Sequence, residues 1–120
     1  MSVKIDTAQI QLDMLQQIQS DLNPYDPMRF SERHFSHAKY FLSILPKIPN
    51  IYPNPGRSLL FSYGNSDDFL EFELFEDGSI GIFYKTSKDN YKYQRSSIYK
   101  ISSFFKYFFP EEMKNESSAG

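Results

Sequence analysis

The sequence predicts an α+β domain of two layers, in which helices pack on one face of an antiparallel β-meander of three to four strands. Two observations carry this prediction. Apolar and acidic side chains alternate along Phe69–Phe75, and apolar alternation resumes after Asp77 and Gly78, which is the pattern of a β-hairpin. Two segments before this hairpin and one after it have apolar residues at helical spacing. The predicted order is therefore α-α-β-β-β-(β)-α.

The first helix is predicted over Thr7–Leu22, with Asp6 as its N-cap. Large apolar side chains recur every four residues along it, and Leu15 widens the stripe that they form. We expect this stripe to be the buried face of the helix. Its members are Ile10, Met14, Ile18 and Leu22.

A second helix is predicted from an N-cap at Ser31 to about Leu45, because two prolines interrupt the chain before it and Pro46 ends it. Its apolar residues share one face, which we expect to be buried. They are Phe35, Ala38, Leu42 and Leu45, with Phe41 beside them.

The strands follow a segment rich in proline. Four prolines lie within the ten residues from Pro46 to Pro55. They exclude a central strand and predict an extended or edge segment there. Three strands are then predicted at Ser58–Tyr63, Phe69–Phe75 and Ser79–Lys85, and a fourth at Tyr91–Gln94. We expect the apolar residues of the hairpin to form the wall of the core, namely Leu70, Phe72, Leu74, Ile80 and Ile82.

The last helix is predicted from a cap at Ser96 or Ser97 to about Phe109, and Pro110 stops it. Its expected buried stripe is Ile98, Ile101, Phe105 and Phe108. We assign residues 1–110 to a single domain and residues 111–120 to a flexible polar tail.

Composition excludes several classes of function. The 120-residue chain has a net charge of −2, which argues against binding to a nucleic-acid backbone. It has no cysteine, so disulfides, thiol catalysis and cysteine-based zinc sites are excluded. The N-terminus shows no apolar signal segment, and no apolar run is long enough for a membrane span. We therefore expect a cytoplasmic protein that does not contact a membrane.

Several short motifs follow one another along the chain: Asn23–Leu45, the proline-rich stretch Pro49–Tyr63, LEFE at Leu70–Glu73 and DGSI at Asp77–Ile80. In their order and spacing they resemble a widespread group of small bacterial and phage proteins. That group has a W-D-x-Y-G-A-like stretch, a P-x-x-x-P-x-x-G segment, an L-E-[IV]-E strand and a D-G-x-[IV] hairpin. This chain departs from the pattern where Asn23–Tyr25 replaces the tryptophan stretch and where Tyr63 stands in place of tryptophan. The resemblance implies a prokaryotic or phage origin and a compact domain, suggests a mobile-element or conflict-system setting, and implies no particular activity.

Two arrangements use residue types that occur in catalytic sites. His34 and His37 lie on neighbouring positions of the second helix, beside Glu32, but nothing else in the sequence indicates further metal ligands or a nucleophile. We interpret them as part of a solvated helix face. Glu71 and Glu73 lie on one strand face roughly 6.5–7 Å apart, but paired carboxylates catalyse glycoside hydrolysis in clefts, and a flat outer face offers none. No catalytic, metal-binding or cofactor-binding residue is therefore predicted.

The remaining signal is aromatic. Phenylalanine and tyrosine make up 18% of the chain, and rings near the C-terminal helix are interleaved with Lys92, Arg95 and Lys100. Tyrosine and arginine are typical of interface hot spots, although a wide buried stripe explains part of the pattern equally well. The residues predicted to bind a partner are Tyr91, Tyr93, Arg95, Tyr99, Phe104 and Tyr107, together with Glu71 and Glu73 of the outer sheet face.

These observations favour a non-enzymatic protein-binding module of a prokaryote or phage. It would act as an inhibitor, antitoxin or anti-defence protein by covering a working surface of its partner. Homodimerisation through the same aromatic residues is a related alternative. A second alternative is the binding of a single-stranded nucleic acid by aromatic and basic residues near the C-terminal helix.

Overall fold

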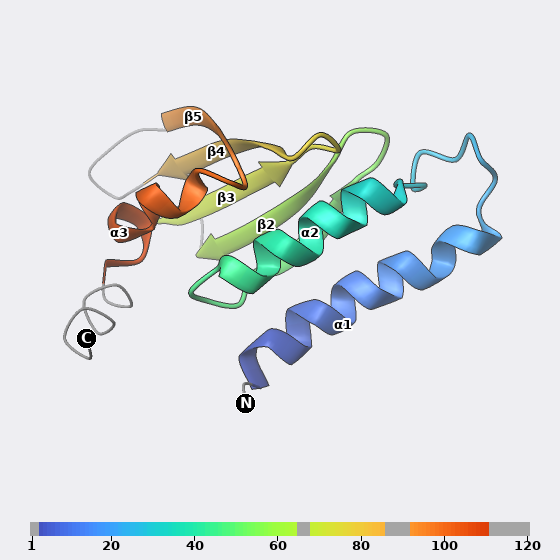
Figure 1. Cartoon of the computed structure of the whole chain (residues 1–120), viewed down its shortest axis with the longest axis horizontal. Helices are drawn as coiled ribbons and strands as arrows, with labels where there is room; N and C mark the ends of the chain where they lie inside the picture. Colours follow the sequence, from blue (N-terminus) through green and yellow to red (C-terminus); the bar gives the residue numbers. More distant parts are fainter. Residues whose placement is uncertain (1–2, 65–67, 86–91, 111–120) are drawn as a thin grey trace.

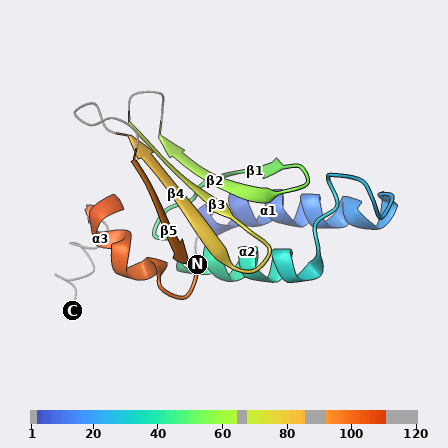
Figure 2. The same ribbon diagram turned by 90° about the horizontal axis from the view of Figure 1, so that it is seen from above.

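The computed structural model describes residues 3–64, 68–85 and 92–110. These residues form a five-stranded antiparallel sheet in the order β1-β2-β3-β4-β5, together with three α-helices (Figure 1). The helices lie on one face of the sheet, as Figure 2 shows from above. The predicted two-layer α+β fold is confirmed, with five strands instead of three to four. The predicted tail, residues 111–120, lies outside the described residues.

Each strand pairs with the next one along the chain. The strands are β1 (Asn50–Asn54), β2 (Ser58–Gly64), β3 (Phe69–Leu74), β4 (Ser79–Lys85) and β5 (Lys92–Ser97). The predicted edge segment is β1, which contains Pro53 and pairs only with β2. In the turn between β3 and β4, Gly78 has a φ of 88°, and a Cβ atom there would lie 3.4 Å from the ring of His37. The positive φ explains why glycine occupies this position, whereas a Cβ atom at that distance from His37 would make an ordinary contact.

The first two helices lie near their predicted positions. Helix α1 spans Val3–Gln17, so it begins before the predicted N-cap Asp6, and it continues as a 3-10 helix, η1 (Ile18–Asp21). Helix α2 spans Glu32–Ile44, and the hydroxyl of its predicted N-cap, Ser31, accepts a hydrogen bond from the backbone N–H of His34 at 3.1 Å.

The last helix begins later than predicted. Ser96 and Ser97 belong to β5, where they pair with Ile80 and Ser79 of β4 instead of capping a helix. The backbone N–H of Ile98 then donates to the carbonyl of Gly78, so this residue is still tied to the hairpin. Helical structure starts with the 3-10 helix η2 (Ile101–Phe104) and the short helix α3 (Phe105–Phe108).

Helix α2 and the sheet meet through a cluster of phenylalanine rings. Phe41 contacts Phe61 and Phe72 edge-on, with centroids 5.0 and 5.2 Å apart, and all three side chains are fully buried. The predicted wall of the core is also buried, namely Leu70, Phe72, Leu74, Ile80 and Ile82. The inner face of the hairpin therefore has the structural role that the alternation indicates.

The predicted buried face of α1 is wrong. Ile10, Met14 and Ile18 are 56%, 61% and 43% exposed, whereas Ala8 and Leu12 are fully buried. The helix lies beside α2 (Figure 1), and its buried side also makes polar contacts with the rest of the domain. One of them joins the side-chain oxygen of Gln11 to the backbone N–H of Ile51 in β1, at 3.1 Å. Apolar periodicity carries no information about such a contact.

Candidate functional site

Both histidines contact backbone carbonyls of the β3–β4 hairpin. The Nε2 atom of His34 lies 2.8 Å from the carbonyl oxygen of Leu74, and the Nδ1 atom of His37 lies 2.9 Å from that of Glu76. His34 is buried, so the predicted solvated helix face is wrong for this residue. Its ring packs edge-on against Phe30. These two contacts therefore connect the β3–β4 hairpin to α2.

His34 is expected to make the stability of the domain sensitive to mild acid. Burial lowers the pKa of its imidazole below the ordinary value of 6.5. The unfolded chain therefore binds a proton at a pH where the folded ring stays neutral, so the free energy of unfolding falls as the pH drops below about 6.5. Urea unfolding at several pH values measures this slope, and His34→Gln is expected to flatten it. His37→Gln, which removes the other carbonyl contact, is the control, and a slope unchanged in His34→Gln would contradict the assignment.

Glu73 points to the outer face of the sheet and is nevertheless buried, with a side-chain exposure of 6%. Its Oε2 atom accepts hydrogen bonds from Arg57 at 2.8 Å, from Ser58 at 2.6 Å and from Asn54 at 3.3 Å. Burial raises the pKa of this carboxyl, but the hydrogen bonds from Ser58 and Arg57 outweigh burial, so its pKa lies below the ordinary value. The side chain of Glu73 is therefore largely covered, whereas Glu71 on the same strand is half-buried, and the prediction that both residues contact a partner stays a prediction.

Tyr93 and Arg95 lie on the outer face of β5 and hold each other in place. The ring of Tyr93 packs on that of Phe83, its register partner in β4, with centroids 4.6 Å apart. A Cβ atom on Gly81 would lie 3.0 Å from the Tyr93 hydroxyl oxygen and 3.1 Å from the ring, so glycine leaves room for the ring in this position. Arg95 donates to the Tyr93 hydroxyl at 3.1 Å, and its guanidinium lies 4.9 Å from the ring centroid of Phe75. Tyr93 is therefore fixed from several sides while 48% of it stays exposed.

A row of side chains crosses all five strands on this outer face. The register pairs Tyr52 with Leu60, Leu60 with Glu73, Glu73 with Gly81, and Gly81 with Arg95. Tyr52, at one end of the row, is 51% exposed, and Tyr93 is the half-exposed ring beside Arg95 at the other end. Within the described residues, no helix covers this face (Figure 2). We call this set the outer-face belt: Tyr52, Leu60, Glu73, Tyr93 and Arg95.

The structure separates the predicted partner-binding residues. Glu71, Glu73, Tyr93 and Arg95 lie on the outer sheet face, whereas Tyr99, Phe104 and Tyr107 lie on the helix side. Tyr91 lies outside the described residues. The ring of Tyr99 is 67% exposed and lies 5.5 Å from that of Tyr40 on α2. The aromatic residues near the C-terminal helix therefore do not form one continuous surface.

The helix side has an aromatic cleft of about 890 Å³ between α3 and one end of the sheet. Tyr63, Tyr84 and Phe104 line it, and the Tyr63 hydroxyl donates to the Lys47 carbonyl at 2.7 Å. Burial raises the pKa of Tyr63. Phe104 is half-buried in the cleft wall, which agrees with the alternative that the last helix has a wide buried stripe. Tyr107, by contrast, is 70% exposed.

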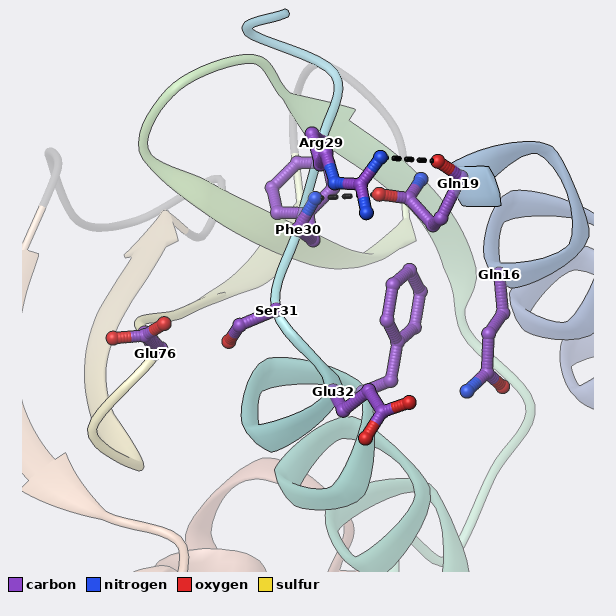
Figure 3. Close-up of a pocket in the computed structure, with 8 residues that line it drawn as sticks. Gln16, Gln19, Arg29, Phe30, Ser31, Glu32 and Glu76 are labelled. Atoms are coloured by element: carbon purple, nitrogen blue, oxygen red, sulfur yellow. Dashed lines mark hydrogen bonds between the residues drawn. The ribbon is translucent and has the colours of Figure 1, made fainter. Parts of the chain in front are cut away.

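A second pocket, of about 510 Å³, lies between the end of α1, the start of α2 and the β3–β4 turn (Figure 3). Its most buried polar group is the amide of Gln19, which donates to the carbonyls of Leu15 and Met28 and accepts from the N–H of Phe30 at 2.6 Å. The guanidinium of Arg29 donates to the backbone carbonyl of Gln19 at 2.8 Å. These hydrogen bonds hold the loop between η1 and α2 against the end of α1. Sequence reasoning missed Gln19, because a glutamine in a helix gives no signal of burial.

Two properties of the structure and three searches bear on identity and chemistry. Among the described residues, no group of three or more histidine, aspartate or glutamate side chains can hold a metal ion. In the same part of the chain, no helix has both the length and the apolar composition needed to cross a membrane. Searches of family models, curated proteins and solved structures found no match to this chain. The resemblance to small bacterial and phage proteins therefore stays a prediction, and function rests on the geometry.

Proposed function

We propose that this protein acts without chemistry of its own, by binding another protein through the outer-face belt. The observation that carries the proposal is the fixed and half-exposed pair Tyr93 and Arg95 on a sheet face that no described helix covers (Figure 2). Tyrosine and arginine contribute most to the energy of many interfaces. Side chains that are already held in place lose little conformational freedom on binding, which favours affinity.

The charges of the belt indicate the chemistry of the partner. The carboxylate of Glu73 is paired with Arg57 and covered, so it offers little negative charge at the surface. The guanidinium of Arg95 remains at the exposed end of the belt, beside the apolar surface of Tyr93. A partner with an apolar centre and an acidic rim fits this arrangement. A broad sheet face is suited to occlusion, the mechanism of an inhibitor, antitoxin or anti-defence protein.

A single-stranded nucleic acid is the second candidate for the same surface. The packed rings of Phe83 and Tyr93 beside Arg95 offer a stacking platform of the kind that binds single strands. Two features weigh against it. The chain has a net charge of −2, and Glu71 pairs in register with Phe83 at the centre of that platform. We therefore favour a protein partner.

Tyr93→Ala is expected to weaken binding of the partner about 30-fold, the loss that follows truncation of a hot spot worth ~2 kcal/mol. The tagged protein is first recovered at moderate salt from cells of its source organism, and a stoichiometric partner is identified by mass spectrometry. The purified partner is then titrated against the parent and the variants by calorimetry. Tyr107→Ala removes a more exposed ring, 70% against 48% for Tyr93, from the helix side and is expected to bind like the parent.

Three results would count against this proposal. Equal binding by Tyr93→Ala and the parent would contradict the assignment of the belt. Recovery of a nucleic acid whose affinity falls steeply with salt would favour the second candidate. Recovery of the chain alone would contradict both candidates. Circular dichroism of each variant ensures that a loss of binding is not a loss of fold.

A further inference from the structure

The two edges of the sheet expose different backbone groups. At the β1 edge, the N–H of Ile51 donates to the side-chain oxygen of Gln11 in α1 at 3.1 Å. Pro53, whose backbone points the same way two residues later, has no N–H. Neither position therefore offers a free donor. Proline and a covering helix are devices that keep a sheet edge from pairing with another chain.

The direction of the backbone groups in β5 follows from two hydrogen bonds near the start of β4. The carbonyl of Ser79 accepts from the N–H of Phe75 at 3.0 Å, so the backbone groups of Ser79 point toward β3. The register partner of Ser79 in β5 is Ser97, whose backbone groups therefore point away from β4. The next pair along is hydrogen-bonded, as this alternation requires, since the N–H of Ile98 donates to the carbonyl of Gly78 at 3.0 Å.

The same alternation directs the backbone groups of Tyr93 and Arg95 outward, because these residues lie four and two positions before Ser97 in β5. Strand β5 pairs with β4 alone (Figure 1), and among the described residues no hydrogen bond from another element reaches the backbone of Tyr93 or Arg95. The guanidinium of Arg95 lies on the outer face instead, 4.9 Å from the ring centroid of Phe75. Unlike the β1 edge, the β5 edge therefore keeps its donors and acceptors, and it lies directly beside the outer-face belt.

We propose that the partner of the outer-face belt supplies an extended segment that pairs with β5 as an additional, antiparallel strand. This inference rests on the proposed function and specifies which part of the partner is recognised. The alternating N–H and C=O groups of an extended chain match the outward groups of Tyr93 and Arg95. The antiparallel direction continues the pattern of the sheet, in which every neighbouring pair is antiparallel.

The side chains at this edge define the chemistry of the added strand. Arg95 forms no ion pair with a carboxylate of the described residues, and Tyr93 presents a half-exposed ring. Opposite charges and pairs of aromatic with β-branched residues are favourable across neighbouring strands. We therefore expect an acidic residue opposite Arg95 and, two positions later in the partner, a β-branched or aromatic residue opposite Tyr93. A second copy of this chain would bring another Arg95 to the same edge, so a foreign acidic strand fits the charge better.

Amide hydrogen exchange of the chain alone, followed residue by residue by NMR, tests whether the edge is open. The N–H groups of Tyr93 and Arg95 are expected to exchange about tenfold faster than those of Gln94 and Ser96, which point toward β4. Equal protection of the two sets would show that the edge is already covered and would overturn the proposal.

The same measurement on the complex tests the added strand, with the stoichiometric protein recovered by the tagged chain as the probe. Binding is expected to slow exchange at Tyr93 and Arg95 about tenfold or more. Ser97→Pro removes one outward N–H without changing the belt or the hydrogen bonds to β4, and it is expected to weaken binding about fivefold, the loss of one backbone hydrogen bond. Ser97→Ala keeps that N–H and is the matched control, which is expected to bind like the parent.

The outcomes distinguish this inference from the proposed function. Slower exchange at Tyr93 and Arg95, together with weaker binding by Ser97→Pro than by Ser97→Ala, would support the added strand. Loss of binding in Tyr93→Ala without slower exchange at Arg95 would leave the belt as the interface and overturn the strand. Protection that rises with the concentration of the chain alone would show that a second copy takes the edge, and would overturn the foreign strand. Recovery of the chain without a partner would overturn both proposals.

Discussion

Replacing Phe41 with alanine is expected to lower the free energy of unfolding by about 3–5 kcal/mol, the usual cost of truncating a buried phenylalanine. Phe41 is fully buried, and its ring contacts Phe61 and Phe72 from α2. Truncation of the ring would leave a cavity between the helix layer and the sheet. Neither layer alone can move to fill that cavity. Because domains of this size are stable by roughly 5–15 kcal/mol, the loss is a large part of the total.

Urea unfolding of three variants checks this expectation. Phe41→Leu keeps most of the volume and is expected to cost less than about 1.5 kcal/mol. Tyr40→Ala removes the neighbouring ring on α2, which is 43% exposed, and is expected to cost less than Phe41→Ala. A loss in Phe41→Ala no larger than that in Tyr40→Ala would contradict the placement of Phe41 between the layers.

Replacing Glu73 with alanine is expected to cost about 2–3 kcal/mol, because three hydrogen-bond donors lose their shared acceptor. The hydroxyl of Ser58 belongs to a fully buried residue and is left without this partner, whereas the side chain of Arg57 is 61% exposed and can return to water. Because Arg57 can be solvated again, the stability lost in Glu73→Ala should be smaller than the loss on breaking a fully buried ion pair. Glu71→Ala is the matched control from the same strand face and is expected to cost less.

The same carboxylate predicts a loss of stability in acid. Its pKa is lower in the folded chain than in the unfolded chain, so its contribution is complete above the unfolded value of about 4.3 and is lost as the pH falls through the folded value. Glu73→Gln, which cannot titrate, is expected to lack this part of the loss. Urea unfolding at neutral pH and in acid compares the two proteins. If both lost the same stability on acidification, Glu73 would not be the group responsible.

The hairpin could be predicted because its signals are local. The strand Ser79–Lys85 has the predicted bounds, since alternation and the turn at Gly78 define it without reference to distant residues. Strand β5 could not be bounded in this way. A serine before an apolar run is typical of a helix cap, but Ser96 and Ser97 extend the strand because they pair with β4. The pairing of β5 with β4 joins two separate segments of the chain, so the spacing of residues within one segment does not predict it.

The orientation of α1 was beyond sequence reasoning for a related reason. The helical segment has two apolar stripes, and the one around Met14 is the exposed one. Ala8 and Leu12 lie inward together with Gln19, whose amide forms hydrogen bonds with the loop after η1. Helical spacing alone allows either stripe to be the buried one, and the contacts with α2 and β1 that distinguish the two stripes involve other segments of the chain.

The candidate site was only partly accessible from the sequence. Tyr93 and Arg95 could be chosen by residue type, because tyrosine and arginine are frequent at interfaces. The alignment of Arg95 with Leu60 and Tyr52 could not be predicted, since it requires the register of all five strands. The burial of Glu73 likewise depends on donors from the β1–β2 region. Short-range patterns do not determine which strands these residues meet.

The sequential pairing of the strands also bears on how the chain folds. Each hairpin closes a short loop, so the sheet can assemble step by step without a large entropic penalty, and folding should be fast for a β-rich domain. The helices contact the sheet over longer sequence separations, since Gln11 lies 40 positions before Ile51 and His34 lies 40 positions before Leu74. Helix α1 precedes β1 in the chain, so during synthesis the contact between Gln11 and Ile51 forms only after β1 has emerged. Helix α2 follows α1 directly and can cover part of the buried side of α1 before the sheet is complete.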